Sequence, residues 1–214
     1  MSTCHGRVST DDVLAEVALV RRGVRASHAR LHRTAALLDE RRMRERSRLP
    51  DWSRGHLLTH LARNADSVVR RIQAAAQDEL IDQYAGGEAG RAAEIEHGAL
   101  RPPDQITADL RAADDVLDVL DVPTKTWSRQ VRRGSGKASV LLSAADLLWS
   151  RWREIEVHHL DLGLGHSIED WPQPLVSWML PRLLEALPER AAQQQLAAWA
   201  LDRGPAPHLR PWGG

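Results

Sequence analysis

In residues 53–72, SRGHLLTHLARNADSVVRRI, the apolar side chains recur with the period of an α-helix. The apolar residues that share one side of this helix are Leu57, Leu61, Val68 and Ile72. A polar stripe of His56, His60 and Asn64 runs beside them at steps of four residues. The stretch therefore predicts an amphipathic helix that places two imidazoles and an amide next to its apolar face.

Three further segments carry the same helical period. Their expected starting points are Thr10, Asp104 and Ser143. The last of them is expected to end at Gly163 or Gly165, since glycine commonly ends a helix. Four amphipathic helices predict an all-α protein, built as a four-helix bundle over residues 1–165.

After this bundle, residues 166–214 are punctuated by prolines and form a short extension. A fifth helix and a short helical piece over about 192–201 are expected there. Strand patterns are scarce, and the run 131–140 is interrupted by the charged and glycine-rich residues RRGSG. The fold is therefore expected to be mainly helical.

The composition argues against nucleic acid and membranes as partners. The chain has 214 residues with 29 basic and 29 acidic side chains, so its formal net charge is zero. This neutrality argues against nucleic-acid binding, and the arginine-rich run 41–48 is interpreted as a solvated loop. No apolar run approaches the length of a membrane span, and the first ten residues lack a signal-peptide pattern. With Cys4 as the single cysteine, we expect a cytoplasmic protein without disulfides.

The helix that is expected to start near Ser143 carries ionisable side chains towards its C-terminal end. Its stripe reads Leu147, Arg151, Glu154, His158 and Asp161, at steps of three and four. Two imidazoles and a carboxylate on facing helices form the ligand set of a catalytic zinc site with one position open. Spacing alone leaves two other interpretations open: a surface ion pair between Glu154 and a nearby arginine, and a competing pair of Glu156 with His159.

Three segments carry a resemblance to a known family. Residues 51–65, DWSRGHLLTHLARNA, resemble the second-helix motif of the mycothiol-dependent maleylpyruvate isomerases, which belong to the wider group of DinB-like metal-binding bundles. Residues 153–163, REIEVHHLDLG, resemble the second signature of that family. Between them, residues 84–98, YAGGEAGRAAEIEHG, are similar to its loop and following helix start. The resemblance runs from about residue 10 to residue 165.

The resemblance implies roles for individual residues. It implies that His60, Glu154 and His158 bind zinc, whereas His56, Glu156 and His159 do not. It implies a substrate-binding arginine at Arg91. A second family arginine matches Arg203, within residues 199–204, where Asp202 replaces the usual glycine of the family. The residues that we expect to contribute to cofactor binding are Asn64, Tyr84 and Asp161, the last as a partner of a ligating histidine.

The resemblance also implies a reaction. Two neutral histidines and one carboxylate leave a bound Zn²⁺ with a net charge of +1, which favours an anionic thiolate in its open position. The thiolate of mycothiol would add to the double bond of maleylpyruvate, and rotation followed by elimination would give fumarylpyruvate. The partners are thus one zinc ion per chain, a small-molecule thiol and an unsaturated substrate, with no nucleic acid and no membrane.

Two alternatives to an isomerase remain. One is a mycothiol S-transferase that conjugates an electrophilic substrate, and the other is a metal-binding bundle without catalysis. The family generally carries a small α/β domain after the bundle, so residues 166–214 are interpreted as a reduced form of it. A monomer or weak homodimer is expected.

Overall fold

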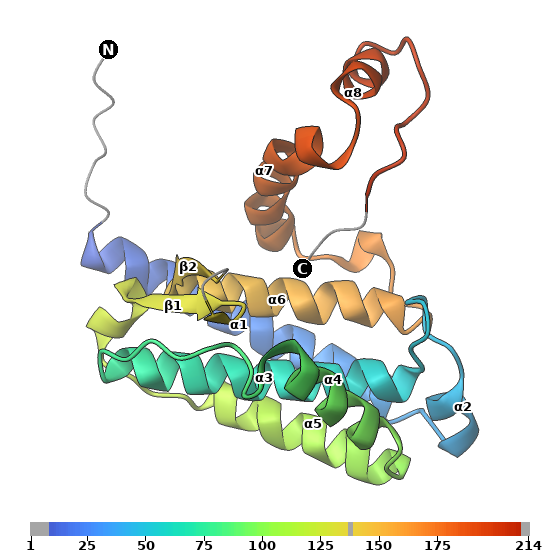
Figure 1. Cartoon of the computed structure of the whole chain (residues 1–214). Helices are drawn as coiled ribbons and strands as arrows, with labels where there is room; N and C mark the ends of the chain where they lie inside the picture. The colour runs from blue at the N-terminus through green and yellow to red at the C-terminus, as the bar shows by residue number, and fades with distance from the viewer. Residues whose placement is uncertain (1–8, 137–138, 211–214) are drawn as a thin grey trace. The chain divides into compact units, whose positions relative to one another are not determined.

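The computed structural model describes residues 9–136 and 139–210. These residues form two compact units, of which the first ends at Asp170 and the second begins at Trp171. Four long helices make up the first unit: α1 (Thr10–Ala35), α3 (Arg54–Ala76), α5 (Pro103–Asp118) and α6 (Ala144–Asp161). They lie side by side in Figure 1, where α1 and α3 each pack on both α5 and α6. The predicted all-α four-helix bundle is confirmed.

Serine side chains set where three of these helices begin. Ser9, Ser53 and Ser143 are the N-caps of α1, α3 and α6, and each side-chain oxygen accepts a backbone N–H from the first turn. At α3 the cap is reciprocal, since Nδ1 of His56 accepts the backbone N–H of Ser53 at 3.2 Å. The predicted starts of α3 and α6 are therefore confirmed, and the cap fixes the rotation of α3 one turn before His60.

A buried ionic network joins all four helices of the bundle. Arg151 of α6 has no exposed surface, and it donates to the Leu61 carbonyl and to Asn64 Oδ1, both at 2.9 Å, and to Asp114 Oδ1 at 2.6 Å. The same Asp114 oxygen lies 3.1 Å from Nε2 of His28 on α1. Burial favours the neutral carboxyl, yet Arg151 and His32 outweigh burial and lower the pKa of Asp114.

One glycine permits a close approach between α1 and α6. A Cβ atom on Gly23 would lie 2.2 Å from the ring of Trp152, which is almost completely buried. The indole of Trp152 fills the space next to α1, and its Nε1 donates to Ser27 Oγ at 2.9 Å. This tryptophan is therefore a core residue in a protein that has no phenylalanine.

Two short elements differ from the sequence expectations. Strands β1 (Gln130–Arg133) and β2 (Val140–Ser143) pair antiparallel, in a region where the sequence shows no strand pattern. Gly134 and Gly136 have φ angles of +87° and +66°, a conformation that lets the chain turn between the strands. Helix α2 (Glu40–Arg44) begins after its N-cap Asp39, so the interpretation of this part as a loop is wrong.

The remaining elements are also helical. Helix α4 (Gly87–Ala99) packs on α3, and η1 (Thr124–Ser128) precedes the hairpin. The first unit ends in η3 (Ile168–Asp170), and the second unit contains α7 (Gln173–Arg190) and α8 (Gln193–Ala200). The fifth helix and the short helical piece are thus present, whereas the interpretation of residues 166–214 as a reduced domain stays a prediction.

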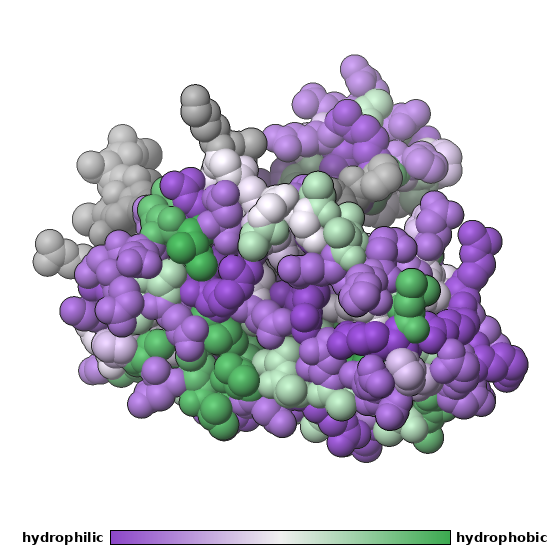
Figure 2. Space-filling view, turned by 60° about the horizontal axis from the view of Figure 1, so that its bottom comes forward, coloured by the Kyte–Doolittle hydropathy of each residue, from purple (hydrophilic) through white to green (hydrophobic). Residues whose placement is uncertain are grey.

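The surface mixes polar and apolar residues. In the face shown in Figure 2, hydrophobic residues appear as separate areas among hydrophilic ones. Within residues 9–136 and 139–210, no helix combines the length and the apolar character needed to cross a lipid bilayer.

The ionic network makes a strong stability prediction. Arg151→Met leaves the buried carboxylate of Asp114 without its guanidinium, so the free energy of unfolding should fall by about 3 kcal/mol or more. Chemical denaturation measures this loss. The control is Arg41→Met, which removes an exposed arginine paired with Glu45 and should shift the midpoint little. Equal shifts in both variants would contradict the role given to the network.

Candidate metal centre

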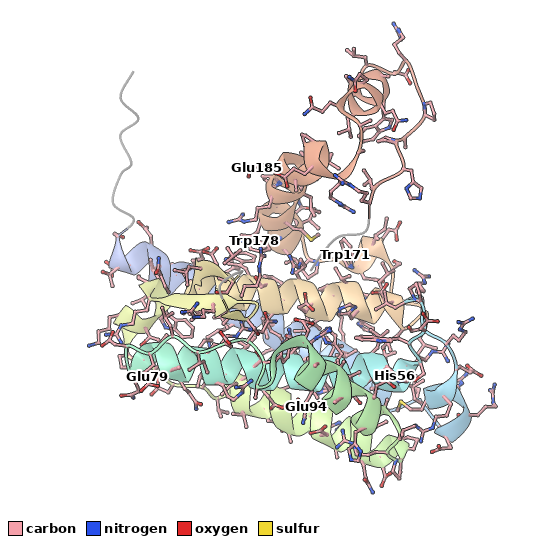
Figure 3. All side chains as sticks on the ribbon, viewed as in Figure 1. His56, Glu79, Glu94, Trp171, Trp178 and Glu185 are labelled. Carbon is pink, nitrogen blue, oxygen red and sulfur yellow. The ribbon has the colours of Figure 1, made fainter. Side chains whose placement is uncertain are left out.

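Helices α3 and α6 bring two histidines and one carboxylate together. His60 comes from α3, and Glu154 and His158 come from successive turns of α6. Each offers one ligand atom, and these three atoms all lie within 4.8 Å of one another. Oε2 of Glu154 lies 3.2 Å from His60 Nε2 and 3.4 Å from His158 Nε2. Figure 3 labels His56 near the first turn of α3, and His60 follows it one turn later.

The side chain of His60 is buried, whereas those of Glu154 and His158 are partly buried. Burial lowers the pKa of His60 to about 4, so this ring is neutral at pH 7. Burial opposes ionisation of Glu154, but hydrogen bonds with His158 and His60 outweigh burial and hold the pKa of Glu154 well below its usual value. Burial also disfavours charge on His158, yet hydrogen bonds with Asp161 and Glu154 raise its pKa to about 9. The cluster is thus a carboxylate beside one neutral and one protonated imidazole.

Two neighbours support the cluster from α6. Oδ2 of Asp161 lies 3.0 Å from His158 Nδ1, so this carboxylate orients the ring whose other nitrogen faces Glu154. Arg153 donates from Nη2 to Glu154 Oε1 at 3.2 Å, and thereby occupies the oxygen that points away from the histidines. Asp161 thus contacts a candidate ligand, and its contribution to cofactor binding stays a prediction.

An arginine from α4 completes one wall of the site. Arg91 lies between two aromatic rings, with its Cζ 5.7 Å from the centroid of Trp52 and 5.6 Å from that of Tyr84. Its Nη2 donates to Nδ1 of His60 at 3.3 Å. Sequence reasoning missed Trp52, although it directly precedes the N-cap of α3 in the segment that carries the resemblance. The one signal in the sequence is its position directly before the N-cap, one helical turn before His56 and two turns before His60.

Tyr84 also borders a hollow beside the site. A cavity of about 450 Å³ is lined by Tyr84 together with residues of α3, α4 and α5, among them Arg63, Arg70, Glu94 and Val116. Glu94 is labelled on α4 in Figure 3. The Tyr84 hydroxyl is buried and finds no hydrogen-bond partner among the described residues. The ring thus borders Arg91 and the cavity.

Two other predicted residues lie in different surroundings. The side-chain oxygen of Asn64 accepts from Arg151 in the core, one turn from His60. Arg203 is an exposed residue of the second unit, after α8, and donates to the Asp202 carbonyl at 3.1 Å. Asp202 has a φ of 55°, a backbone conformation that favours glycine. A cofactor role for Asn64 and a carboxylate role for Arg203 stay predictions.

The residues of the competing interpretations have other partners. Glu156 is buried, and its Oε2 lies 2.9 Å from Nε2 of His166. His159 Nε2 lies 2.8 Å from the hydroxyl of Thr34 on α1. Nε2 of His56 lies 3.3 Å from the exposed Glu96. In the described part of the chain, His60, Glu154 and His158 are the group of acidic and imidazole side chains that could hold a metal ion.

Comparison with known proteins assigns the chain to a family. The sequence profile of the mycothiol maleylpyruvate isomerase N-terminal domain matches residues 24–163. The chain belongs to this family. Two similar crystal structures are those of the mycothiol-dependent maleylpyruvate isomerase, at 27% identity, and of its variant with one histidine replaced by alanine, at 26%. Each has a TM-score of 0.67, and the alignment covers 79% of this chain and 69% of the other. A search of curated proteins found no match.

The donor set suits zinc, which binds imidazole nitrogen and carboxylate oxygen in sites that keep a position open. Because His158 carries a proton at pH 7, metal binding must displace that proton. We expect about one proton released per zinc ion, and an affinity that rises up to tenfold per pH unit between about pH 6 and pH 8. The rise should flatten above a pH of about 9. Calorimetry in buffers of different ionisation enthalpy measures the release.

A matched variant checks this proton assignment. Asp161→Asn removes the carboxylate that stabilises protonated His158, so the pH above which proton release declines should be lower than in the wild-type chain. The same pH dependence of release in both chains, or no release from the wild type at pH 7, would show that His158 is not the protonated group.

Proposed function

We propose that this chain is a zinc-dependent enzyme that uses mycothiol to isomerise maleylpyruvate to fumarylpyruvate. The observation that carries the proposal is the convergence of His60, Glu154 and His158 with Arg91 beside them, in a chain of the isomerase family. The two similar crystal structures are of a mycothiol-dependent maleylpyruvate isomerase, which supports the thiol and the substrate named here.

Each residue has a defined task in this proposal. His60 and His158 provide neutral nitrogen ligands and Glu154 provides the anionic one, while Asp161 keeps Nδ1 of His158 protonated and the ring oriented. When bound there, zinc lowers the pKa of a thiol in its open position, so that a thiolate nucleophile is available at neutral pH.

Arg91 binds the substrate. Its guanidinium is an always-charged group with several donors, and it suits a carboxylate of a dicarboxylic substrate bidentately. The guanidinium lies 5.7 Å from the ring centroid of Trp52 and 5.6 Å from that of Tyr84, beside His60. Arg203 is the second candidate for binding a carboxylate, on the strength of the family motif that it matches.

A mycothiol S-transferase is the second candidate function. The alignment covers 69% of the similar isomerase structures, so part of each has no aligned counterpart here. A different electrophile, recognised by residues outside the shared bundle, is therefore the alternative at the same metal site.

Isomerisation is tested with zinc-loaded protein and maleylpyruvate, with and without mycothiol. We expect catalytic formation of fumarylpyruvate only with the thiol, and free thiol should be fully recovered at the end. Stoichiometric loss of free thiol into a conjugate would instead identify a transferase. If the chain binds zinc but catalyses neither reaction with any of a panel of unsaturated electrophiles, it is a metal-binding bundle without catalytic activity.

The ligand set is tested by zinc stoichiometry. His60→Ala and His158→Ala should each abolish tight binding of the one zinc ion per chain and the turnover that depends on it. The matched control is His56→Gln, one turn earlier on α3, whose side chain contacts Ser53 and Glu96 instead. The control should retain full stoichiometry. Zinc retained in both alanine variants would refute this ligand set.

A further inference from the structure

In each of the two candidate histidine ligands, Nδ1 is the ring nitrogen that faces away from Glu154. One of these nitrogens contacts a hydrogen-bond acceptor and the other contacts a donor. Nδ1 of His158 faces the carboxylate of Asp161, which accepts a hydrogen bond. Nδ1 of His60 faces Nη2 of Arg91 at 3.3 Å, and a guanidinium has donors but no acceptor. Nδ1 of His60 must therefore accept, whereas Nδ1 of His158 donates.

This contact fixes where the hydrogen of His60 lies. The other nitrogen, Nε2, is 3.2 Å from Oε2 of Glu154, and an ionised carboxylate only accepts hydrogen bonds. Nε2 of His60 thus carries the ring hydrogen. A metal ion at this site would need the lone pair of the same nitrogen, so the hydrogen would have to move to Nδ1. His158 already has the arrangement usual for a metal-bound histidine, with its outer N–H on a carboxylate.

We propose that Arg91 competes with the metal for His60, and that metal loading releases Arg91 to bind a carboxylate of the substrate. The inference rests on the proposed zinc site. A metal bound to Nε2 leaves the neutral ring with its hydrogen on Nδ1, so an N–H then faces the N–H groups of Arg91. Two donors facing each other repel, and the guanidinium must turn away.

The contacts of Arg91 allow its guanidinium to rotate away from His60 while the side chain stays at the site. Its other ion-pair partner is Glu88, 3.6 Å from Nη1 and with a side chain 75% exposed, which restrains it little. The rings of Trp52 and Tyr84 still contact the guanidinium when it rotates, because attraction to a ring face does not depend on which N–H is directed outward. Carboxylate binding and metal binding are then reciprocally coupled.

The sign of a mutational effect on zinc affinity tests the proposal. Arg91→Met removes the competing donor, so zinc should bind about tenfold more tightly, as measured by competition with a chromophoric chelator. The matched control is Arg153→Met. It also removes one positive charge in contact with a ligand, but Arg153 donates to Glu154 Oε1, a contact that metal binding preserves. Zinc affinity of the control should stay unchanged or weaken.

Two affinity results would overturn the proposal. Equal tightening in both variants would show that loss of positive charge alone explains the effect. Weaker binding in Arg91→Met would show that Arg91 supports the site, as removal of a supporting partner typically costs about tenfold to a hundredfold.

A spectroscopic measurement is independent of the variants. In ¹⁵N NMR spectra of the metal-free wild-type chain, His60 should carry its hydrogen on Nε2, and in the zinc form on Nδ1. A hydrogen on Nδ1 in the metal-free chain would contradict the proposal while leaving the zinc site intact. If the wild-type chain binds no zinc at all, the proposed function itself fails.

Discussion

The contact between Glu154 and His60 is the constraint on which the site depends, because it places a partly buried carboxylate where α3 meets α6. A buried carboxylate is costly unless charged or donating groups surround it. Here His60 and His158 are the groups that surround the carboxylate of Glu154. The same two imidazoles would bind the metal ion. Arg151, one turn before Glu154, ties the same pair of helices together through Leu61 and Asn64. The fold thus holds the donors together before any metal binds.

The sequence predicted the bundle because helical periodicity and capping serines are local signals. Ser53 and Ser143 begin α3 and α6 as expected, and the rotation of both helices follows from these starts. Spacing could not choose between Glu154–His158 and Glu156–His159, because both pairs fit one helix face equally well. Packing makes the distinction, since Glu156 contacts His166 and Ser27 instead.

The features that sequence reasoning missed depend on contacts distant along the chain. Helix α2 is stabilised partly by Arg44, which donates to the carbonyls of Leu100 and Arg101 after α4. Trp52 acquires its role only because α4 brings Arg91 over it. The partner of Asn64 is an arginine on another helix. No pattern within one segment encodes such pairs, whereas the family resemblance indicated Arg91 without showing what holds it.

A thiol-activating metal centre is tested most directly by the optical spectrum of the Co²⁺-loaded chain during titration with mycothiol. Cobalt substitutes for zinc in nitrogen- and oxygen-ligand sites and reports its ligands by absorption. We expect a thiolate-to-cobalt charge-transfer band that grows to one thiol per chain and is absent in Glu154→Ala. A cobalt site whose spectrum does not respond to the thiol, or a band that persists in Glu154→Ala, would contradict a thiol-activating metal centre at His60, Glu154 and His158.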